Sequence, residues 1–171
     1  YGGNFFVLVE AGQIGLDVCQ ENAPGFVSLG MTILEQANRQ IKVRHPTHPE
    51  IDRILDVRFY QDKPGLGAHS RNIVILGDRM VDRSPCGTGT SADLAVRFAR
   101  GQIKIGEPFI AEGILGTRFK GSVVARVEDP PGNNPFPFVV PLIEGQAFLT
   151  GINQLIYQPG DPFPNGFLLG E

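Results

Sequence analysis

Apolar residues recur along the chain with two different spacings, which predict helices and strands in different segments. One segment predicts an amphipathic helix over residues 28–43, with Ser28 as its N-cap. The apolar residues of that helix stand at every fourth position: Leu29, Ile33, Ala37 and Ile41. A second helix is predicted over residues 91–100, and Gly101 is a suitable residue to end it.

Short apolar runs bounded by glycine, proline or aspartate predict strands. These runs cover residues 4–10, 54–60, 71–76, 109–115, 121–127, 138–143 and 146–150, and Gly77-Asp78 is predicted as a hairpin turn. Two helices among many short strands predict one α+β lobe over residues 1–150, in which a bent antiparallel sheet covers a central helix. Residues 151–171 are predicted to form an extended tail that needs a surface to lie on, since 158–167 is rich in proline and aromatic residues.

Charge and composition narrow the classes of partner. The net charge is −3 and lysine and arginine form no cluster, so neither a nucleic acid nor an anionic membrane surface is an expected partner. No apolar run approaches the roughly 20 residues of a membrane-spanning helix. Only Cys19 and Cys86 could form a disulfide, so a disulfide framework is not expected and a cytoplasmic location is predicted.

The sequence DRSPCGTGTSADLA, residues 82–95, contains the most informative candidate chemistry. Glycines beside Cys86 and a helix start after it would gather backbone N–H groups into a site for a carboxylate or phosphate. The same field favours thiolate, which predicts a Cys86 pKa lowered to about 3.5–7.5. Asp82 is a candidate to bind a cationic group nearby. The alternative is a thiol packed as a small hydrophobic side chain.

Other motifs fail on spacing. No lysine follows the glycines as a phosphate-binding loop requires, and alanine occupies position 92, where a dinucleotide fingerprint needs glycine. His45 and His48 lie among prolines that break a helix, and no third ligand is evident, so no metal site is predicted. His69 is expected to be an exposed loop residue, and Cys19, which lacks a glycine-rich surrounding, a structural one.

Residues 82–92, DRSPCGTGTSA, resemble the second active-site motif of the proline racemase family, which includes proline racemases and 4-hydroxyproline 2-epimerases. The resemblance extends over nearly the whole chain. It includes Tyr1-Gly2-Gly3-Asn4-Phe5, His45-Pro46, His69-Ser70-Arg71-Asn72, Ile114-Leu115-Gly116-Thr117-Arg118-Phe119 and Asp161-Pro162-Phe163-Pro164. It implies one lobe of a fold like that of diaminopimelate epimerase, with the active site between two similar α+β lobes. The first lobe, with a motif of the Met-Cys-Gly-His-Gly-Thr type, would precede Tyr1.

The resemblance also implies a mechanism. Cys86 would be one of two residues that face the α-carbon of proline or 4-hydroxyproline from opposite sides, one as base and the other as acid. Gly87 and Thr88 would bind the substrate carboxylate, and Asp82 would contact the ring amine. No cofactor is implied. The missing lobe would be the chain's partner, and the chain alone is expected to show little or no racemisation.

Two alternatives stay open. Related trans-3-hydroxyproline dehydratases of the Cys/Thr type have threonine in place of Cys86, so cysteine favours a racemase or epimerase, but dehydratases with serine at the missing position remain. The chain could instead be a degenerate, non-catalytic lobe that binds carboxylates or a partner, with dimerisation as one way to cover its exposed cleft face. The choice between proline and 4-hydroxyproline depends on pocket residues and also stays open.

Overall fold

A computed structural model describes residues 1–128 and 135–167 of the chain. The α-helices in these residues are α1 (Ala23–Gln40) and α2 (Gly87–Ala99), and the short 3-10 helices are η1 (Ala11–Ile14), η2 (Gln20–Asn22) and η3 (Gly77–Arg79). The strands are β1 (Phe5–Glu10), β2 (Ile54–Gly65), β3 (Ala68–Leu76), β4 (Met80–Val81), β5 (Phe109–Gly113), β6 (Arg118–Arg126) and β7 (Val139–Glu144). None of the helices in this described part is long and apolar enough to span a membrane.

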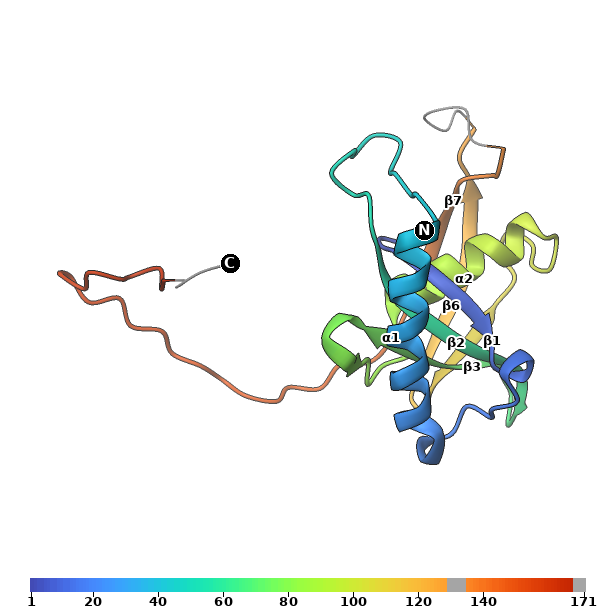
Figure 1. Ribbon diagram of the computed structural model, residues 1–171, viewed down its shortest axis with the longest axis horizontal. Helices are drawn as coiled ribbons and strands as arrows, with labels where there is room; N and C mark the ends of the chain where they lie inside the picture. Colours follow the sequence, from blue (N-terminus) through green and yellow to red (C-terminus); the bar gives the residue numbers. More distant parts are fainter. Residues whose placement is uncertain (129–134, 168–171) are drawn as a thin grey trace.

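The strands form one open sheet in the order β1-β2-β3-β5-β6-β7, with β4 beside β3 (Figure 1). The predicted α+β class is confirmed. The sheet is mixed, because β1 pairs with β2 and β3 pairs with β5 in parallel, while the other pairings are antiparallel. Parallel neighbours need a crossover connection. Helix α1 provides it between β1 and β2, and α2 provides it between β3 and β5.

Helix α1 covers one face of the sheet. Its buried Phe26 packs against Phe59 of β2, with ring centroids 4.9 Å apart. Val57 of β2 and Ile73 and Ile75 of β3 complete this apolar cluster. Successive side chains of a strand point to opposite faces, so Arg58, between Val57 and Phe59, must point away from α1.

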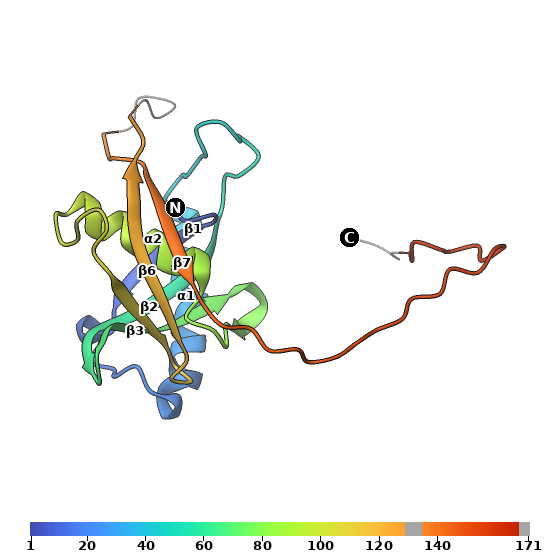
Figure 2. The ribbon, with the colours of Figure 1, turned by 180° about the vertical axis from the view of Figure 1, so that it is seen from behind.

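Helix α2 lies over the other side of the sheet, where the bent strands β6 and β7 also contact it (Figure 2). Its Leu94 is fully buried against Phe109, Ala111 and Val123. Strand β2 is therefore covered on both faces, and side chains from both of its faces are buried. This double coverage determines the surroundings of the candidate site.

Both helices begin earlier than their sequence pattern predicts. Helix α1 starts at Ala23, and Pro24, which has no backbone N–H to leave unpaired, lies in its first turn. Ser28 is therefore not the N-cap but an interior residue, whose carbonyl accepts a hydrogen bond from the Thr32 hydroxyl at 3.2 Å. Helix α2 starts at Gly87, so its glycine-rich segment is the first helical turn and not a loop before it.

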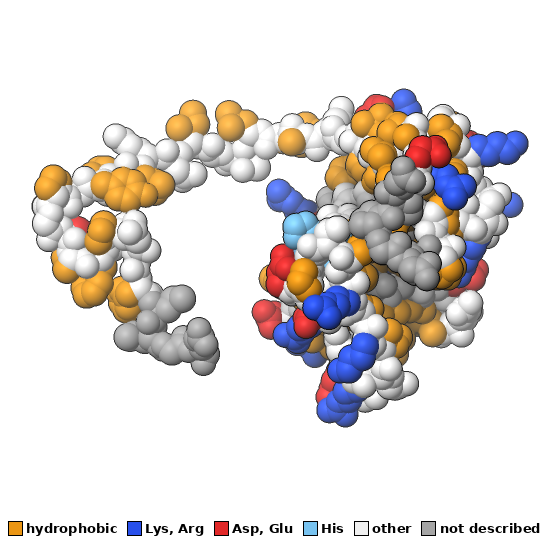
Figure 3. Space-filling model, turned by 90° about the horizontal axis from the view of Figure 1, so that it is seen from above, with side chains coloured by type: hydrophobic (Ala, Val, Ile, Leu, Met, Phe, Trp, Pro, Cys, Tyr) orange, Lys and Arg blue, Asp and Glu red, His pale blue; other side chains and the backbone are white. Residues whose placement is uncertain are grey.

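The predicted strand over residues 146–150 is wrong, because β7 ends at Glu144 and residues 145–150 have no strand partner. From there the chain leaves the body as an extended arm (Figures 1 and 2). Apolar side chains lie exposed along the arm (Figure 3). They belong to Phe148, Leu149, Ile152, Leu155, Ile156, Tyr157, Phe163 and Phe167. The division of the chain at residue 150 stays a prediction, and residues 168–171 of the predicted tail lie outside the described residues.

The packing of α1 on β2 leads to a stability prediction. Phe26→Ala should lower the free energy of unfolding by about 3–5 kcal/mol, because a fully buried ring leaves a cavity. Phe148→Ala is the matched control, since that ring is 82% exposed and its loss should change stability by no more than about 0.5 kcal/mol. Urea unfolding of the 171-residue chain measures both, and equal effects of the two variants would contradict this account of the core.

Candidate active site

Cys86 is the N-cap of helix α2. Its Sγ atom accepts a hydrogen bond from the Gly89 N–H at 3.3 Å, and the residue is 4% exposed. Its backbone has φ 64° and ψ 111°, in a region that non-glycine residues rarely adopt. Such a conformation is unfavourable by about 1–3 kcal/mol and persists only when its surroundings fix it. The contacts that fix it come from both sides of Cys86.

The preceding loop is held by a chain of short hydrogen bonds. The Ser84 N–H and hydroxyl both donate to Oδ1 of Asp82, at 2.8 and 2.9 Å. The Cys86 N–H in turn donates to the Ser84 hydroxyl oxygen at 3.0 Å. Asp82 therefore supports the turn through one carboxylate oxygen, and its Oδ2 takes part in none of these bonds.

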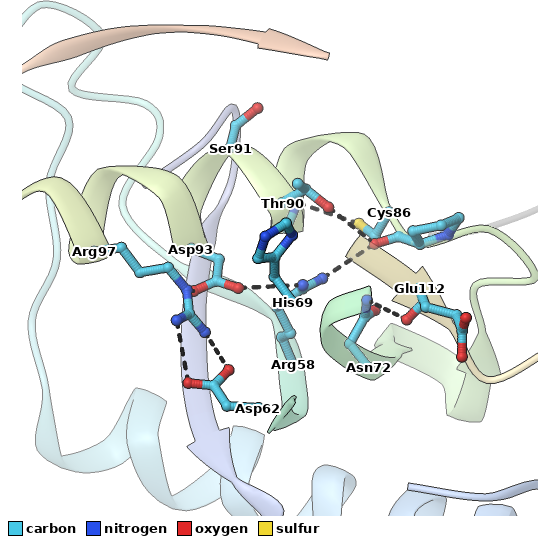
Figure 4. A network of polar contacts seen from close by, with 12 residues as sticks. Arg58, Asp62, His69, Asn72, Cys86, Thr90, Ser91, Asp93, Arg97 and Glu112 are labelled. Carbon is cyan, nitrogen blue, oxygen red and sulfur yellow. Dashed lines mark hydrogen bonds and ion pairs between the residues drawn. The ribbon is translucent and has the colours of Figure 1, made fainter. Parts of the chain in front are cut away.

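The Pro85 carbonyl, one peptide bond before Cys86, has two buried donors. The Arg58 guanidinium from β2 reaches it through Nη1 at 3.1 Å, and the Thr90 hydroxyl from α2 reaches it at 3.1 Å (Figure 4). Arg58 and Thr90 are both fully buried. The peptide that leads into Cys86 is thus attached both to the sheet and to its own helix.

The first turn of α2 leaves backbone donors open. The first N–H groups of a helix have no acceptor within it. Here the Gly89 N–H is used by the Cys86 sulfur and the Thr90 N–H by the Cys86 carbonyl, at 2.9 Å. Among the described residues the N–H groups of Gly87 and Thr88 have no such acceptor, and the space beside Gly87 is open. Cys86, Gly87 and Thr88 thus lie together at one helix end, with Asp82 in the adjoining turn, and their binding of an anion stays a prediction.

A side chain at position 89 would be tight against Cys86. A Cβ atom at this position would lie 3.1 Å from the Cys86 sulfur and 3.4 Å from the Phe6 ring. The absence of a side chain lets the sulfur fold back over the first turn. Small residues in the motif therefore serve the cysteine directly as well as shaping the helix start.

The predicted lowering of the Cys86 pKa is wrong in direction. Burial raises the pKa of the Cys86 thiol, and the negative charge of Asp82 raises it further. Hydrogen bonds from Thr88 and Gly89 and the positive charge of Arg58 act the other way but do not compensate. The sequence shows the favourable dipole of the helix start, whereas the depth of burial depends on the whole fold.

Behind the cysteine lies a buried ionic network that sequence reasoning missed (Figure 4). Asp93 of α2 accepts from Arg58 at 3.4 Å and from Arg97 at 2.7 Å. Arg97 also pairs with Asp62 near the surface, at 3.1 Å through Nη1. The spacing of Asp93 and Arg97, four residues apart in a helix, is a readable signal of one pair. Nothing local indicates that Arg58 completes the network.

The remaining candidates lie elsewhere. His69 is exposed as predicted, but it belongs to strand β3 and not to a loop, and its Nδ1 accepts from the Ile110 N–H at 2.8 Å. His45 is half-buried, and its ring packs at a tilt against Tyr1, with ring centroids 4.8 Å apart. Cys19 is half-buried and lines a different hollow, together with Arg71 and Glu112. No group of three or more metal-ligating side chains suited to a metal ion occurs in residues 1–128 and 135–167.

Comparison with known proteins identifies the relatives of this chain. The sequence profile of the family described as proline racemase matches residues 1–168. The chain is 42% identical to a proline racemase of Clostridioides difficile, covering 99% of this chain and 49% of that protein. It is 41% identical to a 4-hydroxyproline 2-epimerase of Rhizobium etli, covering 100% of this chain and 48% of that protein.

The fold agrees with these sequence matches. A crystal structure of a hydroxyproline epimerase from Agrobacterium vitis, with bound trans-4-hydroxy-L-proline, superimposes with a TM-score of 0.82 at 37% identity. The match covers 99% of this chain and 47% of that one, so the chain spans about half the length of the relatives that it matches. Profile, sequence identity and fold agree, and this chain belongs to the proline racemase family.

Proposed function

We propose that this chain supplies one half of the active site of a cofactor-independent amino-acid racemase or epimerase that acts at the α-carbon of proline or 4-hydroxyproline. One observation carries the proposal: the Cys86 sulfur caps α2 beside the unused N–H groups of Gly87 and Thr88. A proton carrier and a carboxylate site then stand next to each other. That is the pairing needed to exchange a proton next to a carboxylate.

In the proposed complex the substrate carboxylate accepts hydrogen bonds from the Gly87 and Thr88 N–H groups at the positive end of α2. When the α-proton leaves, negative charge spreads onto that carboxylate, and the same donors stabilise it more strongly than in the ground state. Asp82 would hold the ring ammonium through Oδ2, because its Oδ1 is occupied by Ser84.

The raised pKa of the Cys86 thiol suits the role of acid. A residue on the opposite face of the substrate removes the α-proton, and the electron pair of the C–H bond moves onto the α-carbon and carboxylate. The Sγ–H of Cys86 then gives its proton to the other face, which inverts the centre and leaves a thiolate. The reverse reaction uses that thiolate as the base, so both directions balance.

Three observations support a site completed by a second lobe. The chain spans about half of each relative in the comparisons above. A cavity of about 480 Å³ between β1 and α2 is lined by Phe6, Leu8 and Arg97 among others, but Cys86 is not in its lining. The arm beyond β7 exposes apolar side chains along its length.

The bound hydroxyproline of the Agrobacterium vitis relative supports a cyclic amino acid as substrate.

The raised pKa predicts slow alkylation of Cys86. In a Cys19→Ser background, the rate of iodoacetamide modification should rise with pH toward a midpoint above about 8.5, the value of a free thiol. At pH 7 most of the sulfur is then protonated, as a proton donor requires. A midpoint well below 8.5 would show an activated thiolate and remove the acid role from the resting protein.

Exchange of the α-proton tests the reaction itself. The two-lobe parent that carries this chain should incorporate deuterium from heavy water at the α-carbon of proline or 4-hydroxyproline, followed by NMR. Cys86→Ala should lower the rate of inversion by about 10²–10⁴-fold, the usual contribution of a general acid or base. Cys19→Ala is the matched control and should keep full activity.

The 171-residue chain alone should exchange no α-proton, because the opposing residue is supplied by the other lobe. Brisk racemisation by this chain would overturn the half-site proposal. A parent that binds the amino acids but never exchanges their α-proton would favour the non-catalytic carboxylate-binding alternative.

A further inference from the structure

We infer that Arg58 is the positioning residue of this site: it fixes the peptide that leads into Cys86 and places a buried positive charge beside the sulfur. The inference rests on the proposed role of Cys86. Arg58 lies in the middle of β2, far from the cysteine motif in sequence, and touches no substrate in this scheme.

The geometric part concerns one carbonyl group. The Arg58 Nη1 atom donates to the Pro85 carbonyl at 3.1 Å, and the Thr90 hydroxyl donates to the same oxygen at 3.1 Å. Thr90 belongs to α2, so it moves with the helix, whereas Arg58 belongs to the sheet. Arg58 is therefore the side chain that ties the Pro85 carbonyl to the sheet, whereas the earlier part of the loop is held by the Asp82 N–H, which donates to the Val74 carbonyl of β3 at 3.1 Å.

The charge of Arg58 is incompletely paired. Its carboxylate partner, Asp93, is 3.4 Å away and is shared with Arg97 at the shorter distance of 2.7 Å. Arg97 has a second partner in Asp62, whereas the buried Nε atom of Arg58 has no hydrogen-bond partner within residues 1–128 and 135–167. Burial of Arg58 is unfavourable, and the negative charges of Asp93 and of a Cys86 thiolate both offset it. A thiolate at Cys86, one residue after the Pro85 carbonyl that Arg58 binds, would add a second negative charge near this guanidinium.

Of the neighbouring carboxylates, Asp82 acts on the sulfur in the opposite sense. Asp82 approaches from the preceding loop, and its charge disfavours the thiolate. Asp56, two residues before Arg58 in β2, is buried beside Asn4, and its pKa is raised by that burial and by the charge of Asp82. The positive charge of Arg58 lowers the pKa of Cys86 against these effects, so it favours the thiolate that remains after the sulfur has given up its proton.

The test is the pH profile of Cys86 alkylation in the 171-residue chain with Cys19→Ser. Arg58→Met should move the midpoint up by about one pH unit or more, the size expected for loss of a nearby opposite charge. Asp93→Asn should move it down, because Arg58 then loses its competing counter-ion. Arg58→Lys should fall between the wild type and Arg58→Met, since it keeps the charge but not the planar fork.

Arg39→Met is the matched control, because Arg39 is exposed on α1 and pairs with Glu35 of the same helix. It should leave the midpoint unchanged. A purely structural role would shift Arg58→Met and Asp93→Asn in the same direction, or neither, and would overturn the inference.

Circular dichroism establishes which variants fold. If Arg58→Met does not fold, the downward shift of Asp93→Asn and the upward shift of Arg58→Lys relative to the wild type decide the question. Alkylation of Cys86 requires no catalytic turnover. A parent protein without racemase activity would therefore contradict the proposed function, but it would not change the alkylation result.

Discussion

The Pro85 carbonyl is held by the Arg58 guanidinium from the sheet and by the Thr90 hydroxyl from α2, and the geometry of the site depends on these two bonds. They place the peptide before Cys86 so that the sulfur folds back over the first helical turn. The left-handed backbone of Cys86 is unfavourable by itself and needs such support. With the carbonyl fixed, the cap, the Gly89 bond to sulfur and the free N–H groups follow.

This arrangement requires a charged residue to be fully buried, which is unfavourable unless it is well paired. The mixed sheet makes it feasible. Helix α1 packs on the apolar face of β2 through Phe26 and Phe59, and α2 covers the other face, where Asp93 meets Arg58. The crossover connections that create the parallel pairings therefore also enclose the ionic network behind the cysteine.

The sequence around Cys86 predicted which residues gather at the start of α2, but it did not predict the buried residues behind them. The motif around Cys86 could be read because its glycines, its cysteine and its helix are neighbours in sequence. Arg58 could not, because Val57-Arg58-Phe59 is the alternation of a half-exposed strand, and the arginine is buried only in the assembled fold, where α2 and the loop before it contact the arginine. The direction of the Cys86 pKa shift was mispredicted for the same reason, since burial is a property of the assembled fold.

The fold shows the same division between local and tertiary information. The two helices and most strands follow from periodicity, whereas the helix starts do not. Pro24 and Gly87 are poor residues for a helix interior, but Pro24 is tolerated in the first turn of α1, and the Cys86 cap supports Gly87 in the first turn of α2. The apolar run over 146–150 has strand character, but a strand needs a partner for its backbone groups, and the described chain offers none there.

The most direct test of the central claim is a crystal structure of the two-lobe parent with proline or 4-hydroxyproline bound. The account predicts carboxylate oxygens about 2.7–3.1 Å from the Gly87 and Thr88 nitrogens, which is the distance expected for donors that stabilise developing charge. It also predicts the Cys86 sulfur on one face of the α-carbon at about 3–3.5 Å, the approach needed for reaction. A ligand whose carboxylate lies away from the start of α2, or whose α-carbon does not face Cys86, would contradict it.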